Sequence, residues 1–155
     1  MKDRTMDFTE TEALSDGLLL DERWQEPSRI IGYKVVGVFM NHAKTIIRFD
    51  VDAGGTILSE FYRAYGDCCS RGWFEHTEGV SAFLIGGIIK HIIPGPDVPY
   101  SQKNGLTTKK YNFRIITDRG LCILEMRNEH HHSAYGSFIE RIDFAVADVK
   151  IIDDF

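Results

Sequence analysis

The sequence predicts an α+β fold, mostly antiparallel β-sheet with one or two short helices and an N-terminal arm. Short runs rich in β-branched and aromatic residues alternate between apolar and polar positions. Gly, Asn and Asp residues separate these runs, as they do in hairpins. Long helical patterns are not regularly interposed between them, which argues against a parallel βαβ sheet.

Charge divides the chain of 155 residues into two parts. Residues 1–27 carry three Lys and Arg against eight Asp and Glu, whereas residues 28–155 carry fifteen of each. A hydrophobic content of 43% is typical of one ordinary soluble domain at this length. We therefore predict an acidic N-terminal arm over residues 1–28 and a single α+β domain over residues 29–155.

The arm combines acidic residues with an apolar segment. Residues 9–12 are a weak helix start, and Pro27 closes the pattern. Leu18, Leu19, Leu20 and Trp24 are too apolar for a plain linker. We expect this segment to dock on the body of the chain or on a neighbouring subunit.

The elements of the main domain are predicted in chain order. A three-stranded meander is expected first, followed by a loop, a short helix, a strand, a long loop, a hairpin and one or two further strands. The corresponding ranges are strands 33–40, 45–51 and 56–64, loop 66–76, helix 78–84, strand 88–93, loop 94–108, hairpin 111–127 and tail strands within 138–144 and 149–152.

Several classes of function are disfavoured by composition and motif. The isoelectric point near 5.6 and the neutral main domain argue against binding to duplex nucleic acid. The N-terminus lacks a secretory signal, and the longest apolar window, residues 82–89, is too short to cross a membrane. The glycine pairs at 54–55 and 86–87 match no nucleotide-binding loop motif. We therefore expect a cytoplasmic protein that has no membrane partner.

The first polar cluster contains Cys68 and Cys69. Three cysteines without an export signal favour reduced thiols, and adjacent cysteines bridge poorly. One of them is a candidate nucleophile, with His76 as base and Arg71 lowering the thiol pKa. The alternative is structural, one cysteine being a small core residue and the other shaping the loop.

Acidic residues of the same cluster suggest acid–base chemistry. Asp67, Glu75 and Glu78 lie close in sequence to His76. Carboxylates in such segments also serve as caps, and Glu78 is placed to begin the predicted helix.

The second polar cluster ends in three consecutive histidines, His130, His131 and His132. Neighbouring side chains of an extended segment point to opposite sides, so they would not share one metal ion. We predict no metal and no cofactor. The histidines are expected to form a solvated turn, and the alternative is that they stack on a ligand or hydrogen-bond to it.

Arg127 and Asn128 are the sharpest ligand-binding candidates in this cluster. Arginine offers a planar donor fork to a phosphate, and asparagine bonds to the edge of a base or ribose. The alternative for Arg127 is a structural ion pair with Glu125 or Asp67. Trp73, Phe74 and Tyr135 are candidates for stacking a nucleobase, or else core residues.

These motifs together resemble a family of small bacteriophage and prophage proteins of unknown function. The resemblance depends on YGDCCSRGWFEH at residues 65–76, LIG at 84–86, TDRG at 117–120 and EMRN at 125–128, and it covers roughly residues 30–137. The segment after Asn128 departs from the family pattern. The arm and the chain after residue 138 lie outside the resemblance.

In size, β-rich outline and phage setting the chain is also similar to the Thoeris anti-defence sponge proteins. This resemblance implies a non-catalytic oligomer that captures cyclic ADP-ribose-type signals or cyclic oligonucleotides in the cytoplasm of the bacterial host cell. No residue role is carried over from that family.

The leading hypothesis is therefore a protein that sequesters a small phosphorylated nucleotide without catalysis. The predicted ligand-binding residues are Arg71, Trp73, His76, Arg127, Asn128, His131 and Tyr135. One alternative is a protein-binding inhibitor of a host enzyme or defence complex that acts through its acidic arm, and another is a cysteine- or metal-dependent hydrolase. We expect a symmetric homo-oligomer, at least a dimer and by resemblance up to a hexamer, the alternative being a monomer whose arm folds back.

Overall fold

The structure is a computed structural model that describes residues 28–64, 70–94, 98–131, 139–142 and 149–150. Ten strands and two short helical segments lie in these ranges. In order they are η2 (Ser28–Ile30), β1 (Lys34–Met40), β2 (Ile46–Asp52), β3 (Ile57–Ala64), β4 (Ser70–Glu78), η3 (Val80–Leu84), β5 (Ile89–Pro94), β6 (Val98–Lys103), β7 (Leu106–Thr117), β8 (Gly120–His131), β9 (Ile139–Ile142) and β10 (Val149–Lys150).

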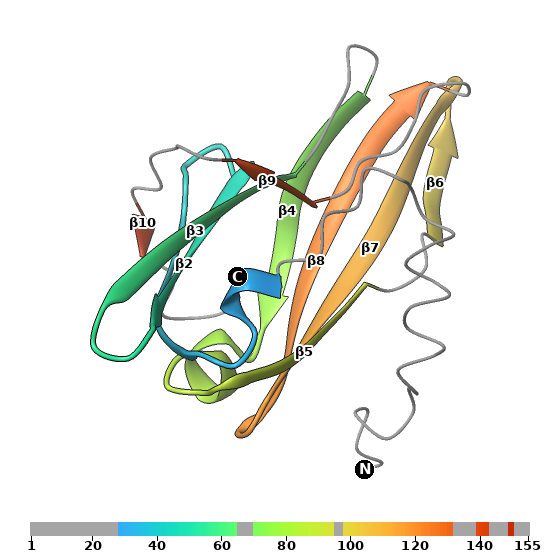
Figure 1. Ribbon diagram of the computed structural model, residues 1–155. Coiled ribbons are helices and arrows are strands. Elements are labelled where there is room, and N and C mark those ends of the chain that lie inside the picture. The colour runs from blue at the N-terminus through green and yellow to red at the C-terminus, as the bar shows by residue number, and fades with distance from the viewer. Residues whose placement is uncertain (1–27, 65–69, 95–97, 132–138, 143–148, 151–155) are drawn as a thin grey trace.

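The strands form two antiparallel sheets (Figure 1). Sheet A has the order β10-β1-β2-β3-β9, and sheet B has the order β4-β8-β7-β5. Strand β6 pairs with β7 beside the part of that strand not paired to β5. The predicted class, mostly antiparallel sheet with short helices, is confirmed.

Both sheets contribute their inner faces to one core. Alternation along β2 buries Ile47, Phe49 and Val51, and alternation along β7 buries Tyr111, Phe113 and Ile115. These side chains belong to a single hydrophobic cluster that spans the two sheets. The alternation of apolar and polar residues in the sequence therefore arises because each sheet buries one face against the other sheet.

Within the described ranges, backbone hydrogen bonds join the two sheets at two places. At one, Val35 N–H donates to the Gly87 carbonyl at 2.9 Å and Gly86 N–H donates to the Val35 carbonyl at 2.8 Å. At the other, Phe74 N–H of β4 donates to the Lys44 carbonyl at 2.7 Å. The second junction holds the β1–β2 turn against the outer edge of sheet B.

The predicted meander and hairpin are confirmed, although several boundaries move. Strands β1, β2 and β3 match the three predicted runs, and β7 with β8 forms the predicted hairpin around residues 118–119. The hairpin strands are twelve residues long each and extend well beyond residues 111–127. Strands β9 and β10 lie within the predicted tail segments.

The predicted loop over residues 66–76 is wrong for its second half. Residues 70–78 form β4, which pairs along its length with β8. A β-bulge between Phe74 and His76 inserts Glu75 and shifts the alternation of buried residues from Gly72 and Phe74 to Thr77. This bulge interrupts the period of two that identifies strands in a sequence.

The predicted loop over residues 94–108 is also wrong in part. Residues 98–103 form β6, and β7 begins at Leu106. Asn104 and Gly105 between them have φ values of 53° and 78°, as a tight hairpin turn requires. The pairing of β6 shifts between Pro99 and Ser101, and this irregular strand lacks a clear apolar alternation.

The predicted helix over residues 78–84 is shorter than expected. Residue Glu78 ends β4, Gly79 adopts a left-handed conformation with φ 77°, and a five-residue π-helix follows at Val80–Leu84. Val80 and Leu84 are its buried residues. The arm, residues 1–27, lies outside the described residues.

Candidate functional site

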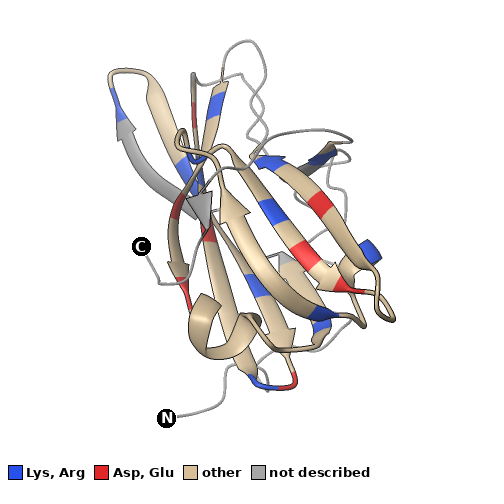
Figure 2. Ribbon diagram, turned by 90° about the vertical axis from the view of Figure 1, so that its left-hand side faces the viewer, with Lys and Arg blue, Asp and Glu red and all other residues tan. Residues whose placement is uncertain are grey.

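The outer face of sheet B carries several of the polar side chains that the sequence analysis singled out. Basic and acidic residues are interspersed along its strands β4, β7 and β8, as they are on sheet A, whose strands face the viewer in Figure 2. Cross-strand pairing places Trp73 opposite Arg127 and Arg71 opposite Glu129. Pairing of β7 with β8 adds Lys110 opposite Arg127. The charged residues therefore form a ladder across three strands.

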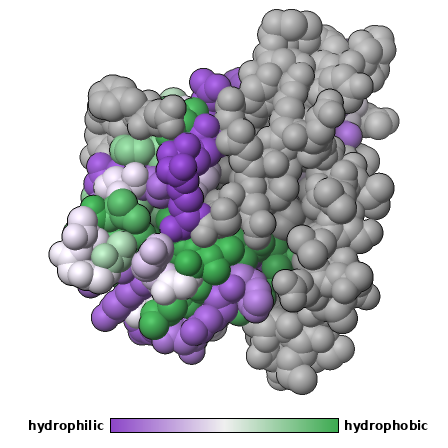
Figure 3. Space-filling view, in the orientation of Figure 1, coloured by the Kyte–Doolittle hydropathy of each residue, from purple (hydrophilic) through white to green (hydrophobic). Residues whose placement is uncertain are grey.

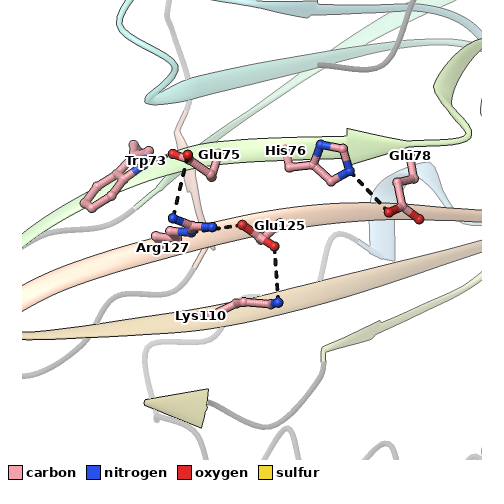
Figure 4. Close-up of polar contacts among 7 residues, drawn as sticks. All are labelled: Trp73, Glu75, His76, Glu78, Lys110, Glu125 and Arg127. Carbon is pink, nitrogen blue, oxygen red and sulfur yellow. Dashed lines mark hydrogen bonds and ion pairs between the residues drawn. The ribbon is translucent and has the colours of Figure 1, made fainter. Parts of the chain in front are cut away.

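Arg127 lies in the middle of this ladder and is held by carboxylates (Figure 4). Its Nε donates to Glu125 at 2.9 Å, and its Nη1 lies 3.7 Å from Glu75. Lys110 Nζ lies 3.5 Å from the other oxygen of Glu125. The alternative considered for Arg127, a structural ion pair with Glu125, is present. The charge of Arg127 is therefore already compensated by two protein carboxylates, one of them hydrogen-bonded to it.

Arg71 and Trp73 form a more accessible unit at the start of β4. The Arg71 guanidinium carbon lies 4.8 Å from the centre of the Trp73 ring, within cation–π range. Trp73 Nε1 donates to Glu75 at 2.6 Å, which fixes the orientation of the indole. Arg71 is 73% exposed, and its contact with Glu129 is a long 3.7 Å. Exposed pairs at such distances are weak, so Glu129 holds the Arg71 guanidinium only loosely.

An open pocket of about 250 Å³ lies next to this unit. Its lining comes from β4 and from the β1–β2 turn and consists of Ala43, Thr45, Arg71, Gly72 and Trp73. Asn41 shapes the turn because its side-chain oxygen accepts from the N–H groups of Thr45 and Ile46 at 2.8 and 2.9 Å. These bonds and the backbone bond from Phe74 to Lys44 fix the conformation of the β1–β2 turn, which forms the wall of the pocket opposite β4.

The pocket offers several kinds of recognition. Gly72 has no side chain, and strand alternation directs its N–H and carbonyl to the same edge of β4 as those of Phe74, towards the turn. The Thr45 hydroxyl accepts from Asn41 Nδ2 at 2.9 Å and keeps its own hydrogen for another acceptor. A cation, an indole, a hydroxyl and a glycine backbone therefore converge on one small volume.

His76 and Asn128 are not part of this pocket. His76 lies after the bulge and pairs with Glu78 at 3.2 Å, farther along β4 (Figure 4). Asn128 is fully buried and points to the inner face of sheet B, whereas its neighbour Arg127 is on the outer face. Its amide donates to the Arg71 carbonyl at 3.1 Å and its oxygen lies 2.8 Å from His130 Nδ1. Asn128 thus supports the backbone of Arg71 from inside.

The other predicted residues are only partly described. His130 is buried against Asn128. His131 ends β8, but its side chain is not among those described, and Tyr135 lies outside the described residues. Cys68, Cys69 and Asp67 also lie outside them, so the nucleophile and acid–base hypotheses stay predictions. Among the residues that the structure describes, no group of three or more His, Cys, Asp or Glu is placed to hold a metal.

Another group of charged residues, which the sequence analysis missed, lies at the inner face of sheet A around Glu60. Glu60 on β3 is 8% exposed and pairs with Arg141 at 3.0 Å and Arg29 at 3.7 Å. Burial, with the charge of Glu60 nearby, raises the pKa of Tyr62 above its ordinary value. The three charged residues come from β3, β9 and η2, which are far apart in sequence, and only the packing unites them.

None of the family models, curated proteins or solved structures with which the chain was compared matches it. Within the described part of the chain, no helix has the length and apolarity needed to cross a membrane.

Proposed function

We propose that this chain is a phage-type, non-catalytic protein that binds and sequesters a small signalling nucleotide, of cyclic ADP-ribose or cyclic oligonucleotide type, and so blocks host antiviral defence. The observation that carries the proposal is the Arg71–Trp73 unit beside the pocket under the β1–β2 turn. The phage setting comes from the resemblance at residues 65–76 and 125–128.

The chemistry of the pocket suits a phosphorylated nucleotide better than other small molecules. A guanidinium donates two parallel hydrogen bonds to a phosphate, and an indole stacks on a nucleobase. The rigid β4 strand places both groups on one side of the pocket. The ladder beside them carries carboxylates at Glu75, Glu125 and Glu129, which disfavours an extended polyanion such as duplex nucleic acid.

The proposal includes a homo-oligomer. The pocket is open, and burying a nucleotide on most sides usually requires a further wall. Large apolar side chains are also exposed on the described surface, namely Tyr33, Val36, Ile57, Leu58 and Phe83. The face seen in Figure 3 gathers apolar groups in its lower part. Light scattering at micromolar concentration tests this part, and a mass near 17.7 kDa would contradict it.

Calorimetry tests ligand binding directly. The full chain is titrated with cyclic ADP-ribose isomers and with cyclic di- and trinucleotides, and we expect at least one to bind. Binding of every compound weaker than about 100 μM, roughly 5.5 kcal/mol, would contradict the proposal. Arg71→Ala should abolish the heat signal. Arg48→Ala is the matched control, because Arg48 also stacks on an aromatic ring but lies on sheet A.

Two further measurements separate the competing classes. After incubation and denaturation, mass spectrometry should recover the nucleotide unchanged, whereas a hydrolase would return a product. Deletion of residues 1–27 should leave nucleotide binding intact. Loss of a host protein partner on this deletion, with no nucleotide bound by the full chain, would favour the arm-driven inhibitor instead.

A further inference from the structure

We infer that the pocket beside Arg71 and Trp73 takes one nucleotide unit with a single phosphate group, and that neighbouring carboxylates exclude a second phosphate. This inference rests on the proposed function and narrows its ligand to cyclic oligonucleotides, because the pyrophosphate of a cyclic ADP-ribose would bring a second phosphate to the same site. It predicts that a larger signal, such as a cyclic dinucleotide, places only one of its units in each pocket.

The size of the pocket is the first argument. Sites that enclose drug-sized ligands have volumes of about 300–1,000 Å³. The pocket at the β4 edge has about 250 Å³ and is bounded by the β1–β2 turn on one side and β4 on the other. Neither wall moves apart easily, because the Phe74–Lys44 backbone bond ties them together. The pocket therefore encloses only part of a dinucleotide, and the rest extends through its open side.

The count of cations is the second argument. Arg71 is the one Lys or Arg side chain among the five described lining residues. The next arginine along the ladder, Arg127, is 19% exposed and already contacts Glu125 at 2.9 Å and Glu75 at 3.7 Å. One guanidinium matches one phosphate.

The position of the carboxylates is the third argument. Glu129 lies 3.7 Å from Arg71, and Glu75 accepts from the indole of Trp73 at 2.6 Å. A phosphate bound to Arg71 displaces Glu129 from a weak contact, but a second phosphate beyond it meets both carboxylates. The negative charges of this second phosphate and of the two carboxylates repel each other, so the binding free energy becomes less favourable with each added phosphate charge.

The test uses Trp73 as its own reporter. The chain has two tryptophans, so Trp24→Phe leaves Trp73 as the single source of indole fluorescence. Its quenching is followed during titration with the 5′-monophosphate, the 3′,5′-cyclic monophosphate and the 5′-triphosphate of adenosine and of guanosine, and with cyclic di-AMP and cyclic di-GMP. Calorimetry of the unaltered chain repeats the titration that gives the tightest binding.

We expect a monophosphate to bind as tightly as the corresponding triphosphate or more tightly. Glu129→Gln should strengthen triphosphate binding at least about fivefold more than monophosphate binding. The matched control is Glu78→Gln, which removes a carboxylate of sheet B that lies on β4 and pairs with His76 away from the pocket. This control should leave the ratio of the two affinities unchanged.

Two results would overturn the inference. The first is a triphosphate that binds about tenfold more tightly than its monophosphate. The second is a cyclic dinucleotide that binds while no mononucleotide does, which would leave the sequestering function standing but not the single-unit site. Absence of binding by every nucleotide, here and in the calorimetric panel, would instead reject the proposed function.

Discussion

Arg48 on sheet A and Arg71 on sheet B make similar contacts but lie in different surroundings. Each guanidinium lies over an aromatic ring, at 3.8 Å from the Phe39 centroid and 4.8 Å from the Trp73 centroid. Arg48 also approaches Asp50 with two nitrogens, at 3.0 and 3.3 Å, and is 24% exposed. Among the described residues, Arg71 contacts one carboxylate, that of Glu129 at 3.7 Å, and it is 73% exposed.

The difference indicates how to distinguish a structural arginine from one that recognises a ligand. Around Arg48 the acid is itself held, because Asp50 accepts from the Ser59 hydroxyl at 2.6 Å. The Arg48 cluster therefore stabilises the fold of sheet A. Around Arg71 the carboxylate is distant, and a pocket lies alongside. An arginine over an aromatic ring can therefore be structural, as Arg48 is, or available to a ligand, as we propose for Arg71, because the neighbouring acid decides whether the cation is satisfied.

The comparison predicts the largest loss of stability for the buried arginine contact of sheet A. Arg141→Ala leaves the Glu60 carboxylate, 8% exposed, without its 3.0 Å partner. We expect the free energy of unfolding to fall by about 2 kcal/mol, because a buried charge loses most of its compensation. Urea unfolding followed by circular dichroism measures this. Arg29→Ala should cost less, since Arg29 is 61% exposed and more distant from Glu60, and an equal cost would contradict the assignment.

The next effect concerns Tyr62, in the same interior cluster. Its pKa is raised from 10.0 by burial and by Glu60, so the folded state favours the neutral phenol. Stability from this group is fully present below pH 10 and is lost above it at about 1.4 kcal/mol per pH unit. Tyr62→Phe should remove that loss and leave stability at pH 7 similar or higher, because among the described residues no group bonds to the Tyr62 hydroxyl. Parallel curves for both proteins above pH 10 would refute the prediction.

The smallest effects on stability test the comparison itself. Arg48→Ala should lower the free energy of unfolding by about 1 kcal/mol, through loss of the ring contact and the Asp50 pair. Arg71→Ala should change it by less than about 0.5 kcal/mol, as for most exposed positions. Nucleotide binding should show the opposite order, with loss in Arg71→Ala and no change in Arg48→Ala. If Arg48→Ala weakened binding as much as Arg71→Ala, the two arginines would not differ in role.

Much of the fold could be predicted from local patterns. The runs that became β1, β2 and β3 alternate cleanly, and the turns between them contain Asn, Asp and Gly. The β7–β8 hairpin was equally clear. Prediction failed where pairing with another strand, rather than local pattern, sets the structure, as in β4 with its bulge at Glu75 and in β6 with its shift after Pro99.

For the candidate site, residue type was more informative than residue order. Arg71 and Trp73 were identified from their chemistry, and the structure places both at one pocket. Arg127 and Asn128 are adjacent in sequence but lie on opposite faces of β8, because successive side chains of a strand alternate. Ala43, Thr45 and Gly72 carry no chemical signal of their own, and they were missed because their role depends on packing.

Local sequence therefore accounts for which segments become strands, since alternation and turn residues act over a few positions. It also accounts for which side chains are chemically able to bind a phosphorylated ligand. The tertiary structure alone places the β1–β2 turn against the edge of β4 and brings Arg29, Glu60 and Arg141 together. It also determines that Arg127 is satisfied by carboxylates while Arg71 is accessible. These outcomes depend on contacts between distant strands, and the free energy of such contacts is not encoded in any short segment.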